Sequence, residues 1–120
     1  MPIIKLPIDQ PKTWILDVDG VVFIHNSHLD GDDVLVDGIR NFIDSIPKDD
    51  YVLLLTARDY KYKDQTLMSL KKHGIRYDEI LFGMPKGERI LINDAKPDGQ
   101  ATAYALNPKR DSAIDVTFER

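Results

Sequence analysis

The alternation of short apolar runs with segments of helical spacing constrains the fold of this chain more than any other feature. Residues 13–18 and 51–55 each have the length and apolar character of a buried strand. Between them, from Asp37 to Ile46, apolar residues recur at the period of a helix. A second helix is predicted over residues 60–73, and further strands over 79–82, 89–92 and 102–106. This order predicts one α/β domain built on a mainly parallel sheet.

Proline and glycine mark the boundaries of these elements. Residues 1–12 contain three prolines and are expected to form an irregular lead-in. Residues 20–36, which are rich in glycine, aspartate, asparagine and histidine, are expected to form a hairpin-like flap. Pro47 ends the first helix, and Gly74 follows the second helix as its C-cap. Residues 107–120 form a C-terminal extension to which the sequence assigns no role.

The composition argues against several classes of function. The net charge of −4 gives no electrostatic footprint for nucleic acid, so nucleic acid is not expected as a partner. The chain has no cysteine, which excludes disulfides, thiolate zinc sites and cysteine nucleophiles and fits a reducing compartment. No apolar run is long enough to span a membrane, and the N-terminus lacks a signal-peptide pattern. We therefore expect a cytoplasmic protein that does not interact with membranes.

Two carboxylates, Asp17 and Asp19, lie at the end of the first predicted strand and flank a single apolar residue. They repel each other, and a cation between them would remove that repulsion. Carboxylate oxygens are the ligands that Mg²⁺ prefers, often together with substrate phosphate. In an open α/β sheet, ligands bind outside the carboxyl ends of the strands, where these acids are expected. Gly20 permits a sharp exit from the strand and a close approach of the backbone to a ligand.

Polar residues also follow three later predicted strands. They are Thr56, Ala57 and Arg58 after residues 51–55, Lys86 after residues 79–82, and Asn93 with Asp94 after residues 89–92. Together with the two aspartates they supply a carboxylate nucleophile, a second acid, a hydroxyl group and cations. Phosphoryl transfer needs these groups, because it depends on a positioned nucleophile and on positive charge around the phosphoryl oxygens.

In order and spacing, the motifs from Trp14 to Asp94 resemble the haloacid dehalogenase (HAD) superfamily of phosphohydrolases. The resemblance implies a three-layer, Rossmann-like HAD fold with a central parallel sheet. It also implies Mg²⁺-dependent hydrolysis of phosphate monoesters through an aspartyl-phosphate intermediate. In that reaction Asp17 is the nucleophile, and Asp19 protonates the leaving oxygen and later activates the hydrolytic water.

The same resemblance assigns the remaining site residues. Thr56 hydrogen-bonds the phosphoryl group, and Lys86 holds the nucleophile and the phosphate together. Ala57 and Arg58 contact the substrate, with Arg58 directed toward its remote part. The metal ligands that the resemblance implies are Asp17, Asp19 through its backbone carbonyl, Asp94 and, as a further candidate, Asn93.

The chain has no room for the cap domain that larger members of this superfamily carry. The gap from Gly20 to Asp37 suits only a flap, and the gap from Asp59 to Lys86 holds one helix and one strand. Capless members act on large substrates or use a neighbouring subunit as a lid, so a homo-oligomer that covers the open site is one expectation. A narrower similarity to small phosphatases of capsule and surface-sugar biosynthesis favours a sugar phosphate or a related small metabolite.

Two alternatives to a small-molecule phosphatase stay open. One is a phosphatase that acts on a macromolecule, such as a nucleic-acid end or a phosphoprotein. The other is a catalytically weak binding or regulatory module with the same fold. Histidines and aspartates also gather in the flap, at His25, His28 and residues 30–33. Their spacing matches neither a calcium loop nor a helical histidine pair, so a solvated flap is expected there.

Overall fold

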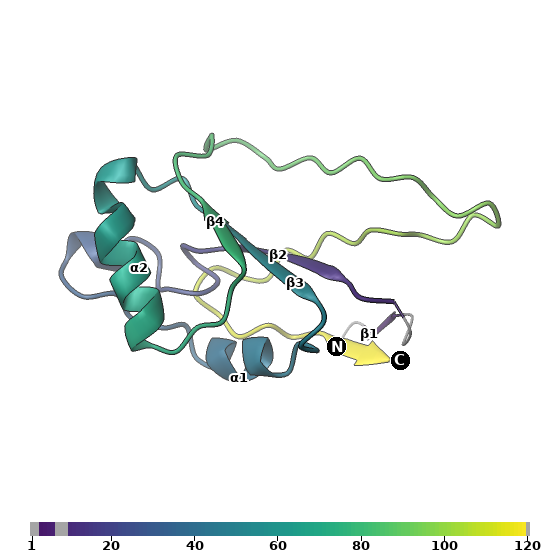
Figure 1. Cartoon of the computed structure of the whole chain (residues 1–120), viewed down its shortest axis with the longest axis horizontal. Coiled ribbons are helices and arrows are strands. Elements are labelled where there is room, and N and C mark those ends of the chain that lie inside the picture. Colours follow the sequence, from purple (N-terminus) through teal and green to yellow (C-terminus); the bar gives the residue numbers. More distant parts are fainter. Residues whose placement is uncertain (1–2, 7–9, 120) are drawn as a thin grey trace.

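A computed structural model describes residues 3–6 and 10–119 of the chain (Figure 1). Its centre is a three-stranded parallel sheet of order β2-β3-β4, formed by Thr13–Asp17 (β2), Tyr51–Leu55 (β3) and Glu79–Leu81 (β4). β2 and β3 pair along their whole length, from Thr13 opposite Tyr51 to Asp17 opposite Leu55. The predictions of an α/β fold and of these three strands are confirmed, with end points that differ by at most one residue.

Two α-helices pack on the same face of this sheet. They are Ile39–Asp44 (α1) and Lys63–Lys72 (α2). Their buried side chains share one core with alternate residues of the strands, and this core includes Ile39, Ile43, Leu70, Leu16, Val52 and Leu54. Because successive strand residues point to opposite faces, the intervening residues of β2 and β3 face away from the helices. The described α-helices therefore form one layer on the sheet, not the two layers that the HAD resemblance implies.

The ends of both helices follow local signals in the sequence. Asp59 accepts a hydrogen bond from the backbone N–H of Lys61 at 2.9 Å, at the start of a 3₁₀ turn, Tyr60–Tyr62 (η2), that leads into α2. Gly74 follows α2 with a φ of 67°, as expected for its predicted C-cap. α1 ends at Asp44, earlier than the helical spacing predicts, although Ile46 still packs in the core. No helix within residues 3–6 and 10–119 is long and apolar enough to cross a membrane.

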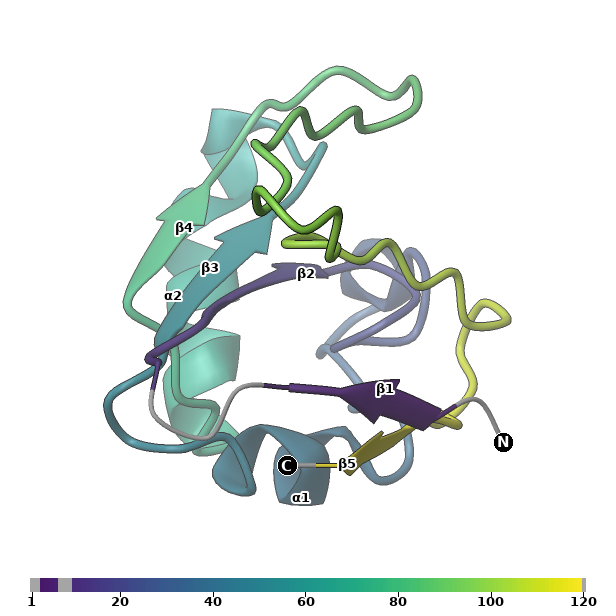
Figure 2. The same cartoon turned by 90° about the vertical axis from the view of Figure 1, so that its right-hand side faces the viewer.

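A second, two-stranded sheet joins the two ends of the chain. Ile3–Lys5 (β1) pairs in parallel with Thr117–Glu119 (β5) (Figure 2). This sheet is anchored by aromatic contacts, since the ring of Phe118 lies 5.1 Å from Trp14 and 6.2 Å from Phe42. The prediction of an irregular lead-in is therefore wrong for residues 3–5, whose partner strand lies at the other end of the sequence. Residues 1–2 and 7–9 of that lead-in lie outside the described residues.

The flap predicted at residues 20–36 has the hairpin-like form expected. Backbone hydrogen bonds of 2.8 and 2.9 Å join residues 22–24 to residues 34–36, and Phe23 forms an antiparallel bridge with Leu35. A short 3₁₀ turn, Ser27–Leu29 (η1), lies between the two limbs. The side chains of Val22 and Phe23 are fully buried, so the base of the flap is part of the hydrophobic core.

Residues 85–107 form a long loop that projects from the body, and we call this segment the arm (Figure 1). All of its residues are exposed. The molecule measures 49 Å along its longest axis against 27 and 26 Å along the others. The predictions of strands at 89–92 and 102–106 are wrong, because neither segment has a strand partner in the described structure. A run of residues that favour β-structure becomes a strand only where a neighbouring strand completes its hydrogen bonds and packing.

Candidate active site

Three of the predicted site residues, Asp17, Asp19 and Thr56, meet at the carboxyl ends of β2 and β3. Asp17 is the last residue of β2, and the next N–H, that of Val18, donates to the carbonyl of Leu55 at 3.0 Å. The hydroxyl of Thr56 donates to Oδ2 of Asp19 at 3.2 Å. Parallel strands end at a common edge of the sheet, which is why residues far apart in the sequence come together here.

Asp17 is the more open of the two acids. Its side chain is 40% exposed, whereas that of Asp19 is 15% exposed. Oδ1 of Asp17 lies 3.8 Å from Nη2 of Arg89, at the base of the arm. Burial raises the pKa of Asp17 above its ordinary value; the charge of Arg89 opposes this rise, and that of Asp19 adds to it. Asp17 is thus an accessible carboxylate with raised basicity.

Asp19 is held by Arg58, which also binds Asp33 of the flap. Nη2 of Arg58 donates to Oδ1 of Asp19 at 3.0 Å and to Oδ1 of Asp33 at 2.8 Å. Its Nε donates to Oδ1 of Asp19 at 3.2 Å, and its Nη1 donates to Oδ2 of Asp33 at 3.1 Å and to the hydroxyl of Thr66 at 2.9 Å. All five N–H donors of the guanidinium are therefore engaged, and the side chain is 1% exposed. In this structure Arg58 joins the flap to the β2 end and presents no donor to a substrate.

Asp33 was expected on a solvated flap, but its side chain is fully buried. Burial alone would raise the pKa of Asp33, yet the hydrogen bonds and charge of Arg58 outweigh it and lower the pKa below its ordinary value. The hydroxyl of Ser27 also donates to this carboxylate, at 3.2 Å. Nothing in the local sequence pairs this aspartate with Arg58, because the two residues meet only when the flap folds against the start of α2.

His28 is a second flap residue whose place the sequence does not reveal. Its Nδ1 is buried without a hydrogen-bond partner among residues 3–6 and 10–119, and it lies 3.9 Å from Oδ1 of Asp19. Its ring packs edge-on against Tyr62, with a centroid separation of 4.7 Å. Burial, followed by the charge of Arg58, lowers the pKa of His28, which favours the neutral imidazole.

The C-terminal extension fixes the loop that carries Asp19. The backbone N–H of Asp111 donates to the carbonyl of Gly20 at 2.8 Å, and its side chain accepts from the N–H of His25 at 2.7 Å. Gly20 has a φ of 91°, and a Cβ placed on it would lie 3.2 Å from Cγ of Arg110. The loop therefore needs glycine for its conformation, and Asp111 in the C-terminal extension has a positioning role that the sequence did not indicate.

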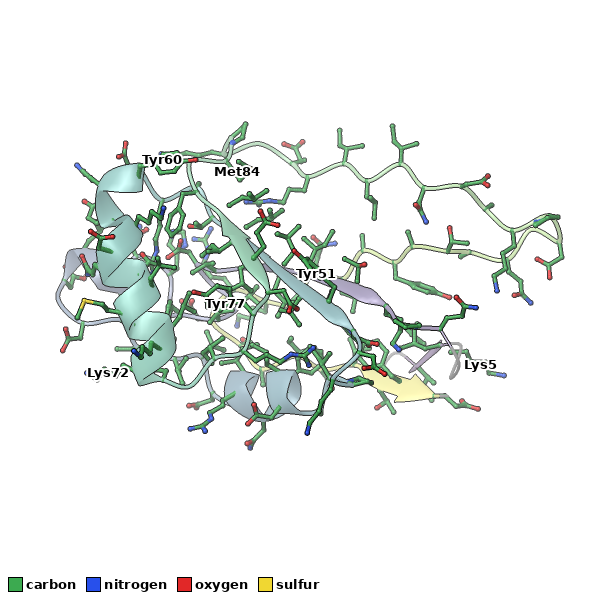
Figure 3. The ribbon with its side chains drawn as sticks, viewed as in Figure 1. Lys5, Tyr51, Tyr60, Lys72, Tyr77 and Met84 are labelled. Atoms are coloured by element: carbon green, nitrogen blue, oxygen red, sulfur yellow. The ribbon has the colours of Figure 1, made fainter. Side chains whose placement is uncertain are left out.

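Lys86, Asn93 and Asp94 lie on the arm, and the structure does not bring them together with the two acids. The amide of Asn93 donates to the hydroxyl of Thr102 at 2.8 Å, across the two limbs of the arm. The arm begins beside Met84, which Figure 3 shows near Tyr60 at the carboxyl end of the sheet. No group of three or more histidine, aspartate or glutamate side chains in residues 3–6 and 10–119 is arranged to hold a metal ion.

Ala57 lies between Thr56 and Arg58 and is partly buried. A surface hollow of about 510 Å³ lies between the flap and α2, where Asp33, Gln65 and Lys72 are among its lining residues. The lining of this hollow includes neither Asp17 nor Asp19. We place the candidate site at Asp17 and Asp19, because reactive groups converge there and not in the hollow. Comparisons of the chain with protein-family models, with curated proteins and with solved structures find no match.

Proposed function

We propose that the chain is a HAD-type phosphatase that hydrolyses phosphate monoesters through an aspartyl-phosphate on Asp17. The observation that carries this proposal is the contrast between the two acids at the end of β2. Arg58 and Thr56 hold the carboxylate of Asp19, whereas the carboxylate of Asp17 is open. An open carboxylate next to a fixed one suits nucleophilic attack followed by proton transfer.

In the first step, an oxygen of Asp17 forms a bond to phosphorus while the bond from phosphorus to the leaving oxygen breaks. Asp19 gives a proton to that leaving oxygen. In the second step, water attacks phosphorus, Asp19 takes a proton from the water, and the bond between Asp17 and phosphorus breaks to release phosphate. Thr56 exchanges its hydrogen bond to Asp19 for one to a phosphoryl oxygen when substrate binds.

We propose that Mg²⁺ binds at this site through Asp17. Mg²⁺ often takes only one or two protein carboxylates and completes its shell with substrate phosphate and water. Asp17 and the backbone carbonyl of Asp19 would hold it, and the ion would supply positive charge to the phosphoryl oxygens. Lys86 and Asp94 would take part only if the arm changed its position, since both now lie on the exposed arm.

The proposed substrate is a sugar phosphate or a related small metabolite in the cytoplasm, on the basis of the family resemblance. Arg89, close to Asp17, suits an anionic substrate. The test is phosphate release from a panel of phosphate monoesters, with Mg²⁺ and with EDTA. The panel includes a 5′-phosphorylated oligonucleotide and a phosphopeptide, because an open site without a cap also suits a macromolecular substrate.

Asp17→Asn should lower the turnover of the best panel substrate by a factor on the order of 10⁴ or more, because it removes the nucleophile. The matched control is Asp44→Asn, which changes an exposed carboxylate on α1 that pairs with Arg40 at 3.6 Å. That control should keep full activity. Turnover retained in a folded Asp17→Asn variant would contradict the proposal.

A binding or regulatory module with little catalysis is the second candidate function. It is favoured by the position of Lys86 and Asp94, which are expected to act in catalysis but lie on the arm. Mg²⁺ binding by calorimetry, without phosphate release from any panel member, would support it. If Asp94 is a ligand in the active form, Asp94→Ala should raise the Mg²⁺ concentration needed for half-maximal activity at least about tenfold. An unchanged requirement would leave Asp17 as the principal carboxylate ligand.

A further inference from the structure

One face of the central sheet is apolar and has no described helix over it. Ile15 of β2 is 47% exposed and Leu81 of β4 is 38% exposed. The strand register places Ile15 beside Leu53 and Leu55 beside Leu81, all on the face opposite the helices. We call these four residues the bare face. Asp17 lies on the same side of β2, two residues beyond Ile15, so the bare face leads directly to the candidate site.

The arm is a second apolar surface without a partner. Ile90 and Ile92 are 84% and 91% exposed, and Leu91 between them is also exposed. Tyr104 and Leu106 add exposed apolar side chains on the returning limb. Contiguous exposed apolar residues of this kind mark interaction surfaces in soluble proteins.

The charges of the arm balance, unlike those of the rest of the chain. Its three cations are Lys86, Arg89 and Lys96, and its three anions are Glu88, Asp94 and Asp98. The net charge of −4 of the whole chain therefore comes from residues outside the arm. A neutral arm can approach an acidic second copy of the chain without the repulsion that two acidic surfaces would have.

Hydrogen bonds shape the arm at its base, near its tip and between its limbs. Its base is tied to the site, since the N–H of Met84 donates to the carbonyl of Thr56 at 3.0 Å. Near the tip, the N–H of Gly99 donates to the carbonyl of Lys96 at 2.8 Å. The bond from Asn93 to Thr102 joins the two limbs. Figures 1 and 2 show the arm running outward, and the high exposure of its isoleucines shows that they do not rest on the bare face of the same chain.

We propose that the arm of one copy packs on the bare face of a second copy, and that two copies exchange arms in a two-fold dimer. The arm offers 23 consecutive exposed residues, 85–107, and a stable interface uses about 20–30 residues on each side. Ile90 and Ile92 lie on one side of an extended segment, and β-branched side chains pack well on a pleated surface. In a two-fold dimer the contact between the arm of one copy and the bare face of the other occurs twice. The dimer does not depend on the proposed phosphatase activity.

The absence of cysteine allows a direct test with single thiols. One variant carries Ile92→Cys on the arm, and another carries Leu81→Cys on the bare face. When the two are mixed and oxidised, we expect a covalent dimer of about twice 13.7 kDa on a non-reducing gel. The control pairs Ile92→Cys with Met68→Cys, which places an exposed thiol on α2. That pair should yield at least about tenfold less cross-linked product.

A chain that carries both Leu81→Cys and Ile92→Cys distinguishes exchange of arms between two copies from closure of the arm on its own sheet. An internal cross-link in this chain at submicromolar concentration, with none between the single variants, would show that the arm closes on its own sheet. That result would overturn the proposal. A mass of 13.7 kDa in sedimentation at 100 µM wild-type chain, with no cross-link in the mixture, would overturn it as well.

Charged residues on the arm provide an independent readout that needs no thiol. Ile90→Glu with Ile92→Glu should raise the dissociation constant of the dimer at least about 100-fold, since both side chains lose their apolar burial. Met68→Glu adds a charge on α2, away from the arm and the bare face, and should leave the mass unchanged. Fluorescence of Trp14, the single tryptophan of the chain, reports whether each variant is folded. Equal dissociation constants for the double variant and the wild type would contradict the proposed contact.

Discussion

At the scale of single residues, Arg58 determines how the flap and the site are joined. Its guanidinium lies between two carboxylates, and its removal leaves the carboxylate of Asp33 buried without a counter-charge. We expect Arg58→Met to lower the free energy of unfolding by about 3–5 kcal/mol, as loss of one partner of a buried ion pair does. Urea unfolding followed by Trp14 fluorescence measures this.

The matched control for Arg58→Met is Arg40→Met on α1. The side chain of Arg40 is 59% exposed, and its ion pair with Asp44 is at the surface. Its removal should change the free energy of unfolding by no more than about 0.5 kcal/mol. Equal losses in the two variants would mean that the buried contacts of Arg58 do not stabilise the fold.

The pH dependence of stability tests Asp33 separately. Because the folded protein lowers the pKa of Asp33, its ionised form stabilises the fold fully above the unfolded-state pKa of about 3.9. This stabilisation is lost as the pH falls from there through the lower folded-state pKa. The difference in free energy of unfolding between wild type and Asp33→Asn should therefore shrink between about pH 5 and pH 2. A difference that stayed constant over this range in urea titrations would contradict the assignment.

At the scale of the elements, the packing of α2 is tested by two neighbouring residues. Leu70 is fully buried in the core, and Leu70→Ala should cost about 2–5 kcal/mol of unfolding free energy. Met68 is on the exposed side of the same helix, and Met68→Ala should change it by no more than about 0.5 kcal/mol. Thermal unfolding followed by circular dichroism compares the two, and similar losses would place Leu70 outside the core.

The sequence predicts those elements whose signals are local. β3 is a continuous apolar run, and Gly74 follows the end of α2, so each is specified within a few residues. β1 depends on a partner strand at the other end of the chain, and no local pattern indicates it. Residues 89–92 carry the composition of a strand without a neighbouring strand, which is why composition alone predicts the arm wrongly.

The candidate site also contains features that the sequence predicts and features that it does not. The meeting of Asp17, Asp19 and Thr56 is predicted, because the carboxyl ends of parallel strands must share an edge. The burial of Asp33 and His28 is not, because it depends on how the flap folds back on the start of α2. The burial of Arg58 follows from that same contact, so its role in the fold was also missing from the prediction.

At the scale of the whole molecule, the proposed exchange of arms would make the stability of the fold depend on the concentration of chains. A dimer gains stability by mass action as the concentration of chains rises. We expect the Tm of the wild type to rise by about 5 °C or more over a hundredfold increase in concentration. The variant with Ile90→Glu and Ile92→Glu should show no such rise. Scanning calorimetry at several concentrations measures this, and a Tm independent of concentration in the wild type would argue for a monomer.

The pairing of β1 with β5 has a consequence for how the chain is made. β1 is synthesised before every other described element, and its partner, Thr117–Glu119, is synthesised after all of them. The central sheet and its two helices can assemble on the ribosome, since their strands lie within residues 13–81. β1 therefore has no partner strand until β5 has been synthesised. The second sheet forms late, after the central sheet can already have assembled.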